Sequence, residues 1–238
     1  MNAGKKRLLT VSGLAVLALA LAVAVALLWQ PGVTRPAVAD RQPAVILLDP
    51  GHGGEDGGAA AADGTLEKTI NLAVALDLRD FFRLWGYPVQ MTRDTDVSIY
   101  DAGSSGTRQM KVSDMHNRLT LYNQAGLVIS IHQNHFSVPK YSGAQVFYSG
   151  SRPESFALAT AVREQLIRQT QPDNTRELKK ATDGIFLLHH TTSPAILVEC
   201  GFLSNPQERE KLKTPEYCQR LACAVFGGYW QYQATAQE

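Results

Sequence analysis

Apolar runs of strand length alternate along this chain with segments whose apolar residues repeat at helical period. The clearest runs are 44–48, 127–131 and 195–198, and strands are also predicted at 89–92, 143–148 and 185–188. Helices are predicted from 65 to 85, from Ser113 to 126, from 154 to 168 and from 215 to 232. Strands that are buried on both faces show nearly continuous apolar runs, so the alternation predicts an α/β fold. We expect a single domain, with a mostly parallel twisted sheet and helices on both faces.

The N-terminal segment has a different pattern. Lys5, Lys6 and Arg7 precede a mostly apolar stretch at 8–29, which is long enough to span a bilayer and longer than the apolar core of most secretory signals. We therefore predict an N-terminal transmembrane helix, with the basic cluster inside and the rest of the chain on the extracytoplasmic side. A small-x-small motif at 37–39 leaves cleavage and secretion as the alternative. The chain then divides into a membrane anchor at 1–30, a linker at 31–43 and a domain at 44–238.

Length and charge narrow the classes of function. With 238 residues, of which 45% are hydrophobic, the chain suffices for one domain of ordinary size plus the N-terminal extension. The net charge is +1, and residues 1–40 contribute +3 through four basic residues and one acidic residue, which leaves −2 for the rest. A slightly acidic domain argues against nucleic acid as a partner.

The cysteines show no pattern of metal binding or disulfide bonding. Cys200, Cys218 and Cys223 form no CxxC pair, and we expect all three to be buried as small apolar side chains. Cys218 and Cys223 are five residues apart on a predicted helix and face different directions, so we expect no bridge between them.

Titratable side chains stand where the apolar runs end. The first run stops at an Asp-Pro-Gly turn, and His52 follows it, flanked by glycines. His132 ends a second strand and Glu199 a third, while Glu67 opens the first helix after the glycine-rich loop. Because ligands of open α/β sheets bind at the carboxyl ends of the strands, we expect these four side chains to line one crevice.

Two imidazoles and one carboxylate form a ligand set that proteins use for catalytic zinc, with the fourth position left to water. The set here is His52, Glu67 and His132, so Zn2+ is the predicted cofactor. Such a site also needs a carboxylate that carries protons and does not bind the metal, and Glu199 is the candidate. Each strand-end histidine also fits a structural role, and Glu199 also fits an ion pair with a buried arginine.

Four motifs follow one another along the domain: Leu48-Asp49-Pro50-Gly51-His52-Gly53-Gly54, Leu66-Glu67-Lys68, Ser130-Ile131-His132-Gln133-Asn134 and Leu197-Val198-Glu199-Cys200-Gly201-Phe202-Leu203-Ser204-Asn205. Together they resemble the zinc-dependent N-acetylmuramoyl-L-alanine amidases of the amidase 3 type, over residues 46–232. The resemblance implies zinc ligands His52, Glu67 and His132, with Glu199 as catalytic acid/base. It also implies that a zinc-activated water hydrolyses the amide bond between N-acetylmuramic acid and L-alanine in peptidoglycan.

Within that family the sequence is most similar to the germination-specific, spore-cortex type. It has an N-terminal apolar segment, no wall-binding repeats, and the stretches 141–148 and 174–176, which resemble this branch. It departs from the family pattern at Gln133 and His135, where alanines are usual, and at the pair His189-His190, which either contacts substrate or lies exposed in a loop. The resemblance predicts a membrane-anchored enzyme of cortex maturation or germination, with peptidoglycan as its partner. The sequence identifies no protein activator.

Three alternatives stay open. Cys200 is a candidate nucleophile, although strand alternation should point Cys200 and Glu199 to opposite faces of the sheet. A zinc peptidase that acts on the peptide stem of peptidoglycan would use the same metal site. A non-catalytic wall-binding protein needs no such site, and the intact set of four residues speaks against it.

Overall fold

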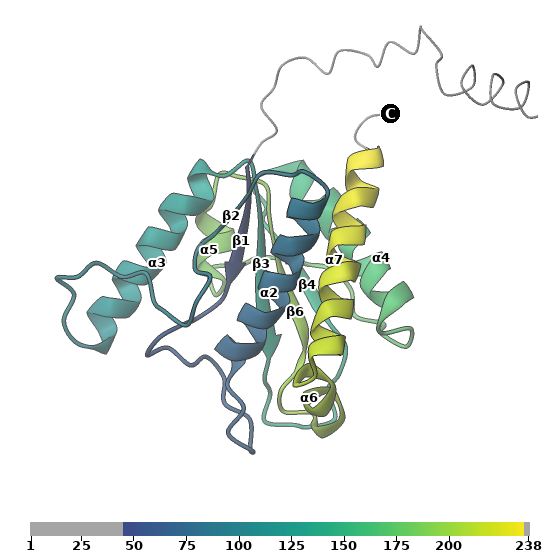
Figure 1. The fold of residues 1–238 in the computed structure, drawn as a ribbon, viewed down its shortest axis with the longest axis horizontal. Coiled ribbons are helices and arrows are strands. Elements are labelled where there is room, and N and C mark those ends of the chain that lie inside the picture. The colour runs from purple at the N-terminus through teal and green to yellow at the C-terminus, as the bar shows by residue number, and fades with distance from the viewer. Residues whose placement is uncertain (1–44, 236–238) are drawn as a thin grey trace, which may run out of the picture. The chain divides into compact units, whose positions relative to one another are not determined.

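The structure, a computed structural model, describes residues 45–235. Within this range a six-stranded sheet forms the centre, with strand order β2-β1-β3-β6-β4-β5 (Figure 1). The strands are β1 Ile46–Pro50, β2 Val89–Met91, β3 Leu127–Asn134, β4 Gln145–Tyr148, β5 Lys179–Lys180 and β6 Ala195–Phe202. The pairs β1–β2, β1–β3, β3–β6 and β4–β5 are parallel, whereas β4 and β6 are antiparallel. The α/β class is confirmed, and the sheet is mostly parallel as predicted, with one antiparallel pair that makes it mixed.

The direction of β4 follows from its connection to β3. Residues 135–144 join the two strands and contain no helix, so the chain turns back instead of crossing over the sheet. β4 then pairs with β6, which places Gln145 opposite Glu199.

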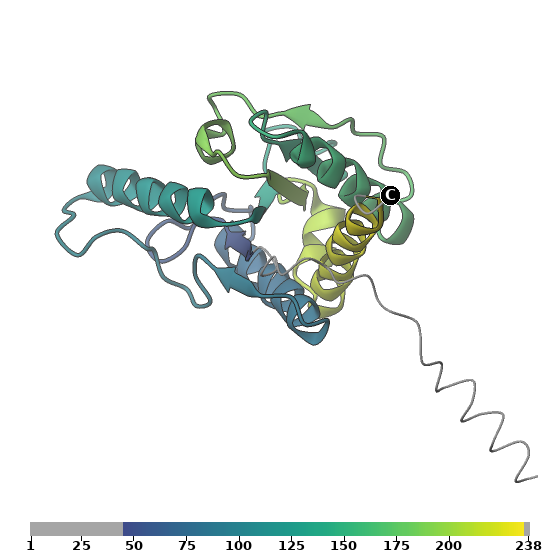
Figure 2. The ribbon, with the colours of Figure 1, turned by 90° about the horizontal axis from the view of Figure 1, so that it is seen from above.

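Helices cover both faces of the sheet, as predicted. They are α2 Glu67–Leu84, α3 Thr107–Gln124, α4 Pro153–Gln169, α5 Phe186–His190, α6 Pro206–Leu212 and α7 Pro215–Thr235. In the view from above, α2, α7 and α4 lie together on one side of the strands, and α3 and α5 lie on the other (Figure 2). Along β1, Ile46 and Leu48 join the larger core under the first group, and Leu47 joins the smaller core under the second. Burial on both faces explains why the strands show continuous apolar runs.

One predicted strand is wrong. Residues 185–188 were expected to be extended, but Phe186–His190 form the short helix α5. Leu187 and Leu188 are both buried in the smaller core, which a helical turn allows and a strand does not, since a strand points consecutive side chains to opposite faces. A short apolar run does not distinguish the two conformations.

Several boundaries also differ from the predicted ones. α3 begins at Thr107, so Ser113 lies inside it and is no N-cap; the Ser113 hydroxyl donates to Asp101 Oδ2 at 2.8 Å. β3 and β6 continue past their apolar runs, so His132 and Glu199 lie within strands and not at their ends. α6 was not predicted, although Asn205 caps it by accepting hydrogen bonds from the next two free backbone N–H groups.

The predicted anchor at 1–30 and linker at 31–43 lie outside the described residues. Among residues 45–235, no helix has both the length and the apolar character that a bilayer span requires. The three cysteines are free thiols; Cys200 and Cys218 are buried as predicted, whereas Cys223 is exposed.

Candidate active site

The loop after β1 holds His52 in an unusual backbone conformation. His52 has a φ of 63°, in the left-handed region that few non-glycine residues adopt, and Gly53 and Gly54 follow with φ of 138° and 57°. Arg118 Nη2 donates to the His52 carbonyl at 2.9 Å, and the Gly53 N–H donates to the Asp56 carbonyl at 2.9 Å. These contacts fix the direction in which the imidazole leaves the end of the strand.

Glu67 lies between the two histidines. Its Oε2 is 3.2 Å from His52 Nε2, its Oε1 is 2.8 Å from His132 Nδ1, and the two imidazole centroids are 5.0 Å apart. One ligand atom from each residue lies within 4.8 Å of the others. Atoms that bind one Zn2+ at about 2.0 to 2.2 Å lie at most about 4.4 Å apart, so small side-chain shifts suffice to bring the three atoms onto one ion. The three residues predicted as ligands are therefore brought together, and their donor set fits a metal ion.

Neighbouring groups hold this set in place. Glu67, the first residue of α2, is 4% exposed; its Oε2 accepts from the Ala59 N–H at 2.9 Å and its Oε1 from the Gln133 N–H at 3.1 Å. His52 Nδ1 is 3.0 Å from Asp56 Oδ2, which leaves Nε2 directed at Glu67. A carboxylate on the far nitrogen is the usual support of a metal-binding histidine.

The carboxylates beside the two imidazoles favour positive charge at this site. Burial lowers the pKa of His52, but hydrogen bonds to Asp56 and Glu67 outweigh it and raise the pKa to about 9. Burial raises the pKa of Glu67, but the hydrogen bonds and charges of His132 and His52 outweigh it and hold the pKa well below its usual range. A carboxylate that stays ionised between two imidazoles is suited to a bound metal.

Glu199 lies beside this set, because His132 on β3 pairs with Glu199 on β6. Its Oε2 is buried and has no hydrogen-bond partner among the described residues. Burial raises the pKa of Glu199 to about 7; the charge of Glu67 acts in the same direction, and those of His132 and His52 oppose it. A carboxyl group with a pKa near neutrality suits proton transfer. The structural alternative, an ion pair with a buried arginine, is wrong: buried Arg118 pairs with Asp49 instead.

A cleft of about 440 Å³ opens over these residues. His52, His132 and Glu199 line its polar part, and Phe136 and Phe186 contribute to an apolar wall. The cleft can thus place an amide group beside both the metal-ligand set and an unpaired carboxylate.

Comparison with known proteins agrees with this site. The family model described as N-acetylmuramoyl-L-alanine amidase, Amidase_3, matches residues 46–229. The chain belongs to this amidase family. It is 40% identical, over 79% of both chains, to the germination-specific N-acetylmuramoyl-L-alanine amidase of Bacillus subtilis. It is 29% identical to the amidase AmiA of Escherichia coli, over 79% of this chain and 75% of AmiA. Among solved structures, the CwlD amidase of Clostridioides difficile, in complex with the GerS lipoprotein, has a TM-score of 0.77 and 38% identity, covering 81% of this chain and 99% of that one.

Family membership confirms the predicted resemblance and activity. The amidase hydrolyses the bond between N-acetylmuramic acid and L-alanine in peptidoglycan. It is therefore a cell-wall hydrolase, which disfavours the stem-peptidase and wall-binding alternatives.

A buried network behind the site was missed from the sequence. The Asp49 carboxylate is fully buried, pairs with Arg118, and accepts hydrogen bonds from the Tyr122 hydroxyl at 2.6 Å and the Thr92 hydroxyl at 2.7 Å. Burial raises the pKa of Asp49, but the charge of Arg118 and these hydrogen bonds outweigh it and lower the pKa to about 2. Since Arg118 also donates to the His52 carbonyl, the network supports the loop that carries His52.

Two other sequence-based candidates lie away from the reacting region. Cys200 is fully buried in the larger core, on the face opposite Glu199, and burial raises the pKa of its thiol. The prediction that Cys200 faces the core is confirmed, and a nucleophilic role has no geometric support. His189 lies on α5, pairs with Asp183 at 2.8 Å, and is not among the residues that line the cleft.

Proposed function

We propose that the amidase holds Zn2+ through His52, Glu67 and His132, and that Glu199 carries the proton in amide hydrolysis. The observation that carries this proposal is the convergence of three ligand atoms within 4.8 Å, next to a buried carboxylate oxygen without a partner. When bound, zinc polarises a carbonyl group and lowers the pKa of a coordinated water to about 7.

Glu199 then has two tasks. With a pKa of about 7, it accepts a proton from the attacking water and can return that proton to the leaving nitrogen of L-alanine. Both transfers are needed, because an amine leaves poorly unless it is protonated. Glu67 stays ionised and satisfied by backbone N–H groups, so it is the poorer proton carrier of the two.

The proposed reaction is tested by identifying which bond of the substrate is hydrolysed. The purified amidase is incubated with a defined muropeptide, and the products are identified by mass spectrometry. An amidase yields peptide-free glycan and an intact stem peptide with a free L-alanine amine. Shortened stems that remain attached to the sugar would instead identify a peptidase.

We further propose that the amidase acts on spore-cortex peptidoglycan from the extracytoplasmic side of the membrane. The germination-specific relative and the apolar run at 8–29 support this proposal. Deletion of residues 1–30 should leave catalysis intact in vitro and release the protein from membranes. If expression of the full sequence yields a soluble protein with Asp40 at its N-terminus, cleavage after Ala39 replaces the anchor.

A protein partner is also proposed, because the CwlD relative was solved with a lipoprotein bound. Co-purification of the tagged, full-length amidase from sporulating cells tests this. A partner recovered in stoichiometric amount supports the proposal, and recovery of the amidase alone contradicts it.

A further inference from the structure

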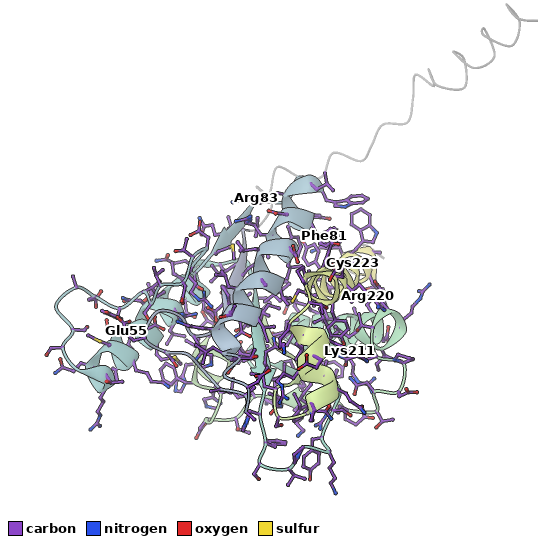
Figure 3. The ribbon with its side chains drawn as sticks, turned by 60° about the horizontal axis from the view of Figure 1, so that its bottom comes forward. Glu55, Phe81, Arg83, Lys211, Arg220 and Cys223 are labelled. Atoms are coloured by element: carbon purple, nitrogen blue, oxygen red, sulfur yellow. The ribbon has the colours of Figure 1, made fainter. Side chains whose placement is uncertain are left out.

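A second cavity, the α6 pocket, lies beside the catalytic cleft and has no assigned role. Its volume is about 570 Å³, and it is lined by residues 140–143 after β3, residues 170–176 after α4, and Asn205 to Lys211 around α6. Lys211 projects from α6 at the end of the molecule that Figure 3 turns toward the viewer. Unlike the catalytic cleft, this pocket is lined mainly by polar groups.

Three cations surround the α6 pocket: Lys140, Arg176 and Lys211. Within residues 45–235, none of them forms a salt bridge; Glu177 and Glu210, which precede or follow two of them in the sequence, pair with Arg163 and Lys213. Arg176 is held in position: its Nε donates to the Ser142 carbonyl at 2.8 Å and its guanidinium lies 4.5 Å from the centre of the Phe202 ring. Its two terminal nitrogens remain available for a ligand.

The two carboxylates that also line the pocket, Glu208 and Asp173, make no salt bridge with these cations within residues 45–235 and leave the lining with a net charge of +1. Glu208 uses Oε1 to accept from the Gly143 N–H at 2.8 Å and Oε2 to accept from the Phe202 N–H at 2.7 Å. Asp173 is exposed and makes no salt bridge in the described part of the chain. The pocket therefore has a net positive charge and a guanidinium with free terminal nitrogens, which suits an anionic ligand.

An aromatic ridge joins the α6 pocket to the catalytic cleft. Phe136 lines the cleft and is 46% exposed; its ring centre is 5.4 Å from that of Tyr141, which is 40% exposed and lines the α6 pocket. The Arg176 guanidinium lies 6.0 Å from the Tyr141 ring. The exposed rings of Phe136 and Tyr141 thus lie between the two cavities, so a ligand can reach from one cavity to the other along the surface.

The substrate has the matching chemistry. The stem peptide of peptidoglycan begins at the L-alanine of the scissile amide, and the residues that follow carry free carboxylates. Three extended residues span about 10 Å, and the steps from the Phe136 ring to the Tyr141 ring (5.4 Å) and from there to the Arg176 guanidinium (6.0 Å) are of that order. We propose that the α6 pocket binds the stem carboxylates through Lys140, Arg176 and Lys211 while the scissile amide lies beside Glu199. This inference rests on the proposed amidase reaction in the catalytic cleft.

The experiment compares two substrates on the full-length protein in detergent. One is a muramyl peptide whose stem carries free carboxylates, and the other is muramyl-L-alanine amide, which has none. The variants are Arg176→Gln, Lys211→Gln and the double variant Lys140→Gln/Lys211→Gln. Lys179→Gln is the matched control, because Lys179 is exposed on β5, makes no salt bridge with any other described residue, and lines neither cavity. Lys211 is exposed and its ammonium makes no salt bridge within residues 45–235, so its variant keeps the test valid if Arg176→Gln misfolds.

For Arg176→Gln, kcat/KM on the stem-bearing substrate should fall about tenfold, because a half-buried, positioned guanidinium makes charge-assisted hydrogen bonds. For Lys211→Gln the loss should be a few-fold, as exposed charge pairs give, and the double variant should lose more than Lys211→Gln alone. Turnover of muramyl-L-alanine amide should not change, and Lys179→Gln should behave as wild type on both substrates. Equal losses on the two substrates, or none on either, would overturn the proposal. Isothermal titration of the free stem peptide gives a second readout. If wild type binds the peptide and Arg176→Gln does not, the proposed role of the pocket is supported. This holds even if wild type hydrolyses neither substrate, a result that would refute only the proposed reaction. If wild type does not bind the peptide, the proposed role of the pocket is overturned.

Discussion

Replacement of Gly51 by alanine tests whether the position of His132 controls the metal site. An alanine Cβ at this position would lie 2.1 Å from His132 Nε2 and 2.2 Å from its Cε1. Non-bonded heavy atoms need about 3.5 Å, so the imidazole would have to move by an ångström or more. Its Nδ1 would then lose its position at 2.8 Å from Glu67.

The expected losses can be estimated from this geometry. Overpacking of this kind costs about 1 to 3 kcal/mol of folding stability, which a domain of this size tolerates. Displacement of a ligand should weaken zinc binding by at least the roughly 10- to 100-fold seen when only a supporting group is lost. Turnover at saturating substrate should fall by about 10² or more, since an error of 1 Å in position has that effect.

Gly57→Ala is the control in the same loop, because its Cβ would make an ordinary contact of 3.4 Å with Leu66 Cδ2. Zinc affinity is measured by chelator competition. Turnover is measured with muropeptides as substrate, and folding stability is measured by urea unfolding. We expect Gly57→Ala to resemble wild type in all three. A folded Gly51→Ala protein with wild-type zinc affinity and turnover would refute the reasoning.

Two further predictions concern groups behind the site. Cys200→Ala should keep most of the activity, because the thiol lies in the core away from Glu199; loss of turnover in a folded, zinc-loaded variant would revive the nucleophile. Asp49→Asn should lower the free energy of unfolding by about 3 to 5 kcal/mol at pH 7, because it leaves Arg118 buried without its main partner. The folded pKa of Asp49, about 2, lies below the ordinary value of 3.8, so this stabilisation is present above pH 4 and is lost as the pH falls toward 2. Urea unfolding of both proteins from pH 7 to pH 2 should show the difference shrinking, and a constant difference would contradict this.

The chemistry of the site could be predicted because it depends on local pattern. His52, His132 and Glu199 stand at or near the ends of apolar runs that form neighbouring strands, and this topology brings their side chains together. Glu67 could be placed because a helix start follows the glycine-rich loop. Neither the grouping of the three strand residues nor the placement of Glu67 depends on knowing the complete strand order of the sheet.

What escaped prediction depends on contacts between distant segments. Arg118 reaches Asp49 from a helix 69 residues further along, and nothing in either local sequence identifies the partner. The direction of β4 depends on how residues 135–144 turn, and residues 185–188 are too short an apolar run to separate helix from strand. The α6 pocket likewise combines cations from three separate segments.

The central claim assigns metal binding to His132 and proton transfer to Glu199, and one parallel measurement separates these roles. Zinc content by atomic spectroscopy and turnover on muropeptides are determined for His132→Ala and Glu199→Gln. His132→Ala should lose zinc and turnover together. Glu199→Gln keeps the shape of the side chain, so zinc should stay near one per chain while the rate falls by about 10² to 10⁴. Loss of zinc from Glu199→Gln would make Glu199 a ligand, and full activity in that variant would contradict the mechanism.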